Sequence, residues 1–138
     1  MDIAGIEDAL VSAVQGAQAF RAVLPVLRGK RPPALIFPAA FIWLDSAIPR
    51  QARSRPMIDM TYGISVVTKN VLSEDAASKD VYQLILAVYS AVQGKFFGRP
   101  DIEPFELASV EFADFEAGEI SYELKFKTGH SQIVPKME

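Results

Sequence analysis

Residues 73–98 constrain the fold of this chain more than any other segment, because they read as one long amphipathic helix with two defined ends. Ser73 or Asp75 can cap the first turn, and Gly94 stands where a left-handed C-terminal cap is needed. Apolar residues recur here at steps of three and four positions, so a helix carries on one stripe Val81, Leu84, Ile85, Val88 and Val92. A stripe this apolar has to be buried, and one face of a sheet is wide enough to cover it.

A second stripe of the same kind opens the chain and predicts a helix over residues 2–18. Its members are Ile3, Ile6, Leu10 and Val14. Gly5 and Gly16 each weaken such a helix by about 1 kcal/mol relative to alanine. We therefore expect this helix to form because it docks on the sheet, rather than on its own.

Residues 34–44 are almost continuously apolar and aromatic, which is typical of a strand covered on both faces. Pro38 lacks a backbone donor, so this strand either lies at a sheet edge or bends at a bulge around that residue. Residues 20–27 stay unassigned, because Pro25 interrupts a short apolar run. Residues 29–33 are expected to form a turn with a basic edge.

The clearest strand signal lies at residues 57–69, where apolar and polar side chains alternate with a period of two. The face expected to be buried carries Ile58, Met60, Tyr62, Ile64 and Val66. The other face is expected to meet water. Residues 107–112 and 120–128 predict a second hairpin around a turn at residues 114–119, and the tail 129–138 is expected to be loose.

Together these segments predict the order helix, strand, strand, helix, strand, strand. The expected fold is an α+β two-layer sandwich, with a mainly antiparallel sheet of about four strands and two helices packed on one face. Half of the 138 residues are apolar and 22% are charged, which suits a single domain over residues 1–138 with an adequate core.

A search for catalytic or cofactor chemistry gives mostly absences. The chain has no cysteine, which excludes disulfides, thiolate metal sites and cysteine nucleophiles. His130, the only histidine, lies near the expected loose end and is interpreted as a solvated surface residue. The segment around Gly94 lacks the spacing of a phosphate loop. A hard cation or simple solvation would suit Asp101, Glu103 and Glu106, which lack calcium-loop spacing. We expect a protein that is not an enzyme and needs no cofactor.

Two features favour an interaction protein. Residues 45–56 are expected to form an extended, mobile loop, into which Arg50, Arg53 and Arg55 crowd as a candidate interaction loop. Such a loop is either a soluble hairpin tip or a contact with an acidic protein or nucleic acid. The polar face of the strands at 57–69 and 120–128 can serve as a subunit contact or meet water. The net charge of -3 shows no bias of the whole molecule towards nucleic acid.

Five segments spread over nearly the whole chain carry a likeness to a known family. They read IAGIEDAL at 3–10, ALIFP at 34–38, YGISVV at 62–67 and SYELKF at 121–126, together with the long helix that bears Tyr82. In these patterns of strand and helix the chain resembles the small tail-completion or tail-terminator proteins of Mu-like phages. The resemblance implies a structural phage or prophage virion protein that caps the tail tube and joins it to the head-neck connector. It offers no catalytic residues to carry over.

The same resemblance implies a homo-oligomeric ring, such as a hexamer, with the tail tube, sheath proteins and head-neck connector as partners and DNA passing through the lumen. It also implies location in the virion after assembly in the host cytoplasm. No membrane partner is expected, because the sequence shows neither a signal peptide nor an apolar run that spans a bilayer. The alternative interpretation is a small ligand-binding or adaptor domain of α+β type without a tail role.

Overall fold

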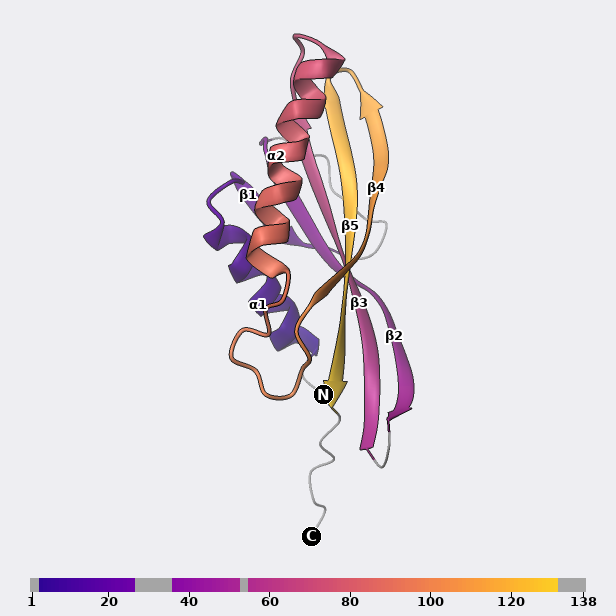
Figure 1. Ribbon diagram of the computed structural model, residues 1–138. Coiled ribbons are helices and arrows are strands. Elements are labelled where there is room, and N and C mark those ends of the chain that lie inside the picture. Colours follow the sequence, from indigo (N-terminus) through magenta and orange to yellow (C-terminus); the bar gives the residue numbers. More distant parts are fainter. Residues whose placement is uncertain (1–2, 27–35, 53–54, 132–138) are drawn as a thin grey trace.

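The computed structural model describes residues 3–26, 36–52 and 55–131, and it places two helices on one face of a five-stranded sheet (Figure 1). The elements in chain order are α1 (Ile3–Gly16), β1 (Ala22–Pro25), β2 (Ala39–Ala52), β3 (Arg55–Lys69), α2 (Glu74–Val92), β4 (Glu106–Glu116) and β5 (Glu119–Ser131). The strand order is β1-β2-β3-β5-β4, and only the β1–β2 pair is parallel among these strands. The predicted two-layer α+β architecture is confirmed, with one strand more than expected and a mixed sheet.

The additional strand is β1, which comes from the segment that the sequence left unassigned. Pro25 is tolerated because it is the last residue of a strand at the sheet edge, where a missing donor costs little. Two further hydrogen bonds of 2.8 Å extend the pairing. The backbone amide of Arg21 donates to the carbonyl of Pro38, and the amide of Val26 donates to the carbonyl of Ile42. A parallel pairing this short leaves no periodic pattern in the sequence. The turn expected at residues 29–33 lies outside the described residues.

β2 begins and ends later than predicted. Pro38 stands just before the strand, after a cis peptide bond, instead of at a bulge within it. The bulge lies further along, between Leu44 and Ser46. From there β2 stays paired with β3 to its end, so the mobile loop expected at residues 45–56 is wrong over most of its length. The end of β2 contains polar residues and therefore reads as a loop in the sequence, although its pairing with β3 continues.

The main core lies between the helices and the facing side of the sheet. On β3 every second residue from Ile58 to Val66 is buried there, as the alternation predicts. The helices contribute Ile6, Leu10 and Val14 from α1, and Ala77, Val81, Leu84, Val88 and Val92 from α2. Both predicted stripes are confirmed, and their burial stabilises the fold by about 25 cal/mol per Å² of apolar surface removed from water.

α2 has the predicted N-terminal cap, because Ser73 Oγ accepts a hydrogen bond from the backbone amide of Ala76 at 3.0 Å. The helix ends at Val92, well before residue 98. Gly94 follows with a φ of 73°, in the left-handed region that the cap prediction required. The Gly94 amide donates to the carbonyl of Phe105 at 2.8 Å, which brings the chain back to the sheet.

We define the outer face of the sheet as the face turned away from the helices. This face is less exposed to solvent than predicted. Gly63, Ser65 and Val67 lie on this face of β3 and are buried. A small second core forms there from Ala39, Phe41 and Val67, with Ala22, Val26 and Phe37 packed against it. The expectation of an uncovered polar face is therefore wrong for this part of β3, because residues of β1, β2 and the adjoining chain cover it.

β4 and β5 form the predicted second hairpin, and both strands are longer than expected. Ala117 and Gly118 make its turn with φ values of 52° and 82°, the left-handed pair that a two-residue hairpin turn needs. β5 continues to Ser131, so Gly129 and His130 lie in the sheet rather than in a loose tail. The rest of the expected tail, residues 132–138, is outside the described part of the chain.

Candidate assembly surfaces

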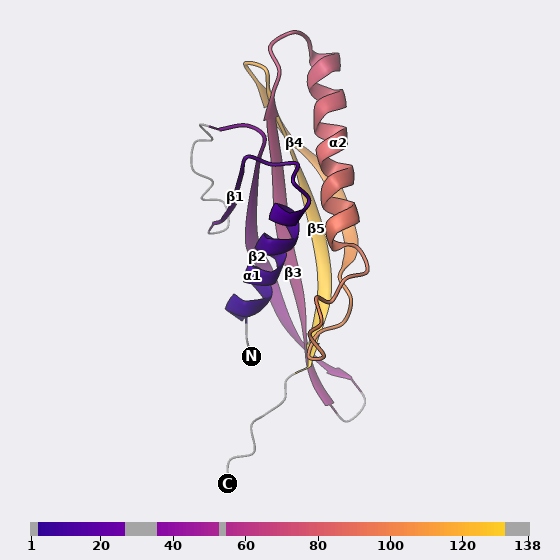
Figure 2. The same cartoon turned by 90° about the vertical axis from the view of Figure 1, so that its left-hand side faces the viewer.

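The hairpin arm, formed by the ends of β2 and β3, reaches beyond both helices (Figure 2). Arg50 lies on this arm, and its Nε donates to the two carboxylate oxygens of Asp59 at 2.8 and 2.9 Å. Its Nη2 donates to Glu103 Oε1 at 3.3 Å. Of the other two arginines of the candidate interaction loop, Arg55 is the first residue of β3 and Arg53 lies outside the described residues.

Arg50 therefore acts within the chain, where it ties the hairpin arm to the segment that follows α2. Two carboxylates face its single positive charge, and they raise the pKa of its guanidinium, chiefly through the hydrogen bond to Asp59. Gly129 permits the arrangement, because a Cβ at that position would clash with the Glu103 carboxylate. The sequence did not reveal these partners, since the β2–β3 register and a residue far along the chain bring them together.

His130 is buried, which corrects its interpretation as a solvated surface residue. Its Nε2 lies 3.1 Å from Asp101 Oδ2, and the same oxygen accepts a hydrogen bond from Arg99 Nη2 at 3.1 Å. The Ser131 amide donates to the Asp101 carbonyl at 2.8 Å. This cluster fastens the segment after α2 to the end of β5, a structural role in which the half-buried Arg99 and Asp101 give the buried His130 a charged partner.

The pKa of the Asp101 carboxyl is lower than its usual value. Burial by itself raises that pKa, but hydrogen bonds from Arg99 and the backbone, with the charges of Arg99 and His130, outweigh the effect. The folded pKa thus lies below the unfolded one. The resulting stabilisation is present above the unfolded pKa, near about 4, and is lost as the pH falls through the folded pKa.

We predict that Asp101→Asn removes part of this acid sensitivity. The free energy of unfolding should fall less steeply below about pH 4 than in the wild type, because the carboxylate that must be protonated is gone. Urea unfolding at stepped pH measures the effect, with Asp114→Asn as a control that removes an exposed carboxylate. If the free energy of unfolding falls equally steeply with decreasing pH in Asp101→Asn and in the wild type, this cluster contributes nothing to the acid sensitivity.

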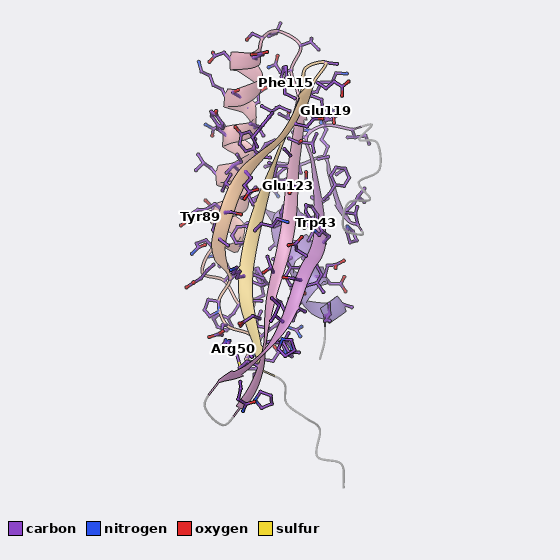
Figure 3. All side chains as sticks on the ribbon, turned by 90° about the vertical axis from the view of Figure 1, so that its right-hand side faces the viewer. Trp43, Arg50, Tyr89, Phe115, Glu119 and Glu123 are labelled. Atoms are coloured by element: carbon purple, nitrogen blue, oxygen red, sulfur yellow. The ribbon has the colours of Figure 1, made fainter. Side chains whose placement is uncertain are left out.

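The middle of the outer face carries an ordered cluster around Trp43 (Figure 3). The indole lies over Gly63, where any Cβ would clash with the ring, and its Nε1 donates to Asp45 Oδ1 at 3.3 Å. Lys125 Nζ donates to the same oxygen at 2.9 Å and lies 5.1 Å from the centroid of the Trp43 ring. These residues come from β2, β3 and β5, so the cluster joins three strands across the outer face.

Towards the β4–β5 turn the outer face becomes acidic. The ladder sets Glu111 opposite Glu123 and Glu116 opposite Glu119, and like charges in such positions weaken a strand pair. Asp114 lies on the same face, opposite Ser121. Figure 3 shows Glu119 near the turn and Glu123 towards the middle of the sheet. This acidic half of the outer face suits a partner surface that carries positive charge.

A strip of exposed apolar side chains lies between α2 and β4, and we call it the α2–β4 seam. It consists of Tyr82, Leu86 and Tyr89 from α2 and Val110 and Phe112 from β4. Tyr122 joins the two elements at one end, with ring centroids 6.2 Å from Tyr82 and 5.6 Å from Phe112. At the other end Gln93 Oε1 accepts from the Leu107 amide at 2.8 Å. The sequence analysis missed this strip, although the four- and three-residue spacing of its helical members, a second stripe beside the buried one, could have revealed it.

An open depression of about 460 Å³ lies beside Arg50 on the outer face. Asp59 and Glu103 line it and both bond to Arg50, and the charged side chains of Glu106 and Lys127 line it as well. Asp101 instead contacts His130, so the acids after α2 that were weighed as cation ligands do not converge. Within the described ranges, no three histidine, cysteine or acidic side chains gather closely enough to hold a metal ion. None of the described helices has the length and apolarity to cross a membrane.

Comparison with known proteins gives a likeness of fold. No family model matches the sequence, and no curated protein matches it. Among solved structures, the fold is similar to a chain described as "Virion of native gene transfer agent (GTA) particle". The superposition has a TM-score of 0.64 at 15% sequence identity and covers 94% of this chain and 98% of that chain. The two chains therefore share their fold over almost their whole lengths.

Proposed function

We propose that this protein is a structural component of a phage-type virion, a tail terminator or tail-completion protein that caps the tail tube and joins it to the head-neck connector. The observation that carries the proposal is the likeness of fold, over nearly the whole of both chains, to a chain from the virion of a gene transfer agent particle. Since fold alone does not fix function, the virion role is inferred from the surfaces as well. The proposal includes the absence of catalytic activity and of a cofactor.

The shape of the molecule supports assembly into a ring, for which a hexamer is the proposed size. A closed ring of identical subunits needs a heterologous contact, in which one patch meets a different patch on the next copy. The hairpin arm at one end of the sheet and the acidic half of the outer face at the other are two unlike patches of this kind. The protruding hairpin arm is suited to reach the acidic half of a neighbour's outer face, and in the sequence Arg53 and Arg55 follow directly after β2.

In this proposal the ring binds the end of the tail tube on one side and the head-neck connector on the other, with sheath proteins beside it and DNA passing through its lumen. Assembly takes place in the host cytoplasm, and the finished protein resides in the virion. A binding role of this kind uses the outer face and the hairpin arm as contact surfaces.

The experiment that tests this proposal is co-sedimentation with purified tail tubes from the phage or prophage that encodes the protein. We predict that the wild type binds tube ends in a fixed number of copies, and that alanine at Arg50, Arg53 and Arg55 weakens binding at least tenfold. The control replaces three exposed cations elsewhere, Arg21, Lys79 and Lys95, and should bind as the wild type does.

Two outcomes of this experiment are decisive. Unchanged tube binding by the triple arginine variant would show that the arginines of the hairpin arm do not contribute to binding, while the terminator role would stand. A wild-type protein that stays in the supernatant at saturating concentration, with tubes whose ends are open, would overturn the terminator role itself. Light scattering on the same samples gives the number of copies bound.

A further inference from the structure

β4 is an open edge strand. It pairs with β5 on one side, and all 11 of its residues are at least partly exposed. Natural sheets protect such edges with short strands, proline, charged side chains or bulges, and the opposite edge here has β1 ending at Pro25 and Pro49 within β2. β4 contains neither proline nor a basic residue, and its two bulges leave a regular run from Ser109 to Phe112 between them. The backbone groups of this run are available to another strand.

The helix side of this edge is apolar and uncovered. α2 packs on β3 and β5 and stops short of β4, so the α2–β4 seam remains in contact with water. The exposed fractions are 39% for Val110, 56% for Phe112, 48% for Tyr82, 57% for Leu86 and 41% for Tyr89. A strand added to β4 would turn every second side chain towards this seam. Apolar residues at those positions would bury side chains that the fold itself leaves exposed.

The opposite side of the same run is acidic. Glu111 and Asp114 lie on the outer face of β4, and Glu111 faces Glu123 across the ladder. The remaining side chains of an added strand would project here, and positive charges would relieve the repulsion between these carboxylates. From this alternation we propose that the β4 edge binds an extended segment of a different polypeptide, which pairs as a sixth strand and alternates apolar with basic residues.

A second copy of this chain is a poor occupant of this edge. Two β4 strands paired about a two-fold axis would bring the acidic outer faces of the two strands side by side, which is unfavourable. In the described ranges, the opposite sheet edge is short or interrupted by proline. The inference goes beyond the proposed function, because it concerns the backbone edge of β4, a different partner and a different measurement. It does not depend on ring formation, because peptide binding to the β4 edge is measured without tail tubes.

The test uses the full chain and a fluorescent eight-residue peptide that alternates valine with lysine, with a valine–glutamate peptide as the charge-reversed probe. We expect saturable binding of the basic peptide by fluorescence anisotropy and at least tenfold weaker binding of the acidic one. Hydrogen exchange should slow within residues 109–112 when the basic peptide is bound, because the amides of this run that point away from β5 become paired.

Two variants of β4 separate the apolar and the charged contributions. The first variant combines Val110→Ser with Phe112→Ser and removes apolar contacts. The second combines Glu111→Gln with Asp114→Asn and removes negative charge. Each variant should bind the basic peptide at least fivefold more weakly than the wild type. The control is Ile48→Ser, which truncates an exposed apolar residue on β2. Equal binding of both peptides, or a loss equally large in the control, would overturn the inference. A change of the chain's own oligomeric state in the variant with Val110→Ser and Phe112→Ser would overturn it too, because the edge would then join identical copies.

Discussion

Tyr62→Ala is expected to destabilise the fold by about 3–5 kcal/mol, the range found when a large buried aromatic side chain is removed. Tyr62 lies at the centre of the core face of β3 and has no exposed surface. Its ring makes an edge contact with Phe105, with centroids 6.0 Å apart, and its hydroxyl lies 3.5 Å from the carbonyl of Ile3. The residue therefore links α1, the sheet and the segment after α2. A loss of this size is a large fraction of the ~5–15 kcal/mol that stabilises a typical domain.

Urea unfolding followed by circular dichroism measures this effect, and Tyr62→Phe is the matched control. That variant keeps the ring and removes only the hydroxyl, so a loss of about 0.5–1.5 kcal/mol is expected. Equal losses for the two variants would mean that the hydroxyl, and not the packing of the ring, supports this part of the core. A loss below about 1 kcal/mol for Tyr62→Ala would contradict the described core, because it would require the site to collapse without a cavity.

Gly63→Ala is expected to destabilise the fold by about 1–3 kcal/mol, the usual cost of overfilling a packed site. The added Cβ would lie 2.8 Å from the indole nitrogen of Trp43 and closer still to its ring carbons. Trp43 is only 6% exposed, so it must move outwards, away from Asp45 and Lys125. Because it is the only tryptophan in the chain, its fluorescence should shift to longer wavelength as the indole enters water.

Two further variants identify the clash as the cause. Trp43→Val removes the ring, and adding Gly63→Ala to it should then cost much less than in the wild type, a non-additivity typical of residues in contact. Gly129→Ala is the matched glycine control, because the atoms its Cβ would meet belong to the flexible ends of Glu103 and Arg50, which can swing aside. Additive losses in the double variant, or an unshifted emission in Gly63→Ala, would contradict the placement of Trp43 over Gly63.

The elements with long periodic patterns could be predicted from the sequence because the spacing of their apolar residues, which decides which face is buried, is a local property of the sequence. The stripes of α1 and α2, the Ser73 cap and the alternation on β3 are each set by residues a few positions apart. In each of these segments the apolar residues recur with the period of a helix or a strand and so lie on one face. The element and its buried face therefore follow from the sequence without tertiary information.

The hairpin arm and β1 could not be predicted, because pairing with a neighbour decides their structure. The ends of β2 and β3 hold their register through polar residues that read as a loop. β1 is four residues long and ends in proline, so it gains its structure from the ladder with β2. Both cases are ones in which tertiary pairing overrides a weak local preference.

The candidate site was predicted only in part. The sequence placed Arg50 at the hairpin, yet its partners Asp59 and Glu103 emerge from the strand register and from a segment more than forty residues away. The burial of His130 has the same origin, since its partner Asp101 lies 29 positions earlier. Ion pairs between distant segments leave no trace in a single sequence, whereas the clustering of arginines does.

The central claim is that the outer surfaces of this two-layer scaffold serve to assemble a virion. A cryo-electron microscopy reconstruction of purified tail tubes after addition of the protein tests it most directly. We predict a closed ring with rotational symmetry at the tube end, in which the hairpin arm of each copy contacts the acidic outer face of the next. A bare tube end at saturating protein, with the chain remaining monomeric in solution, would contradict the claim.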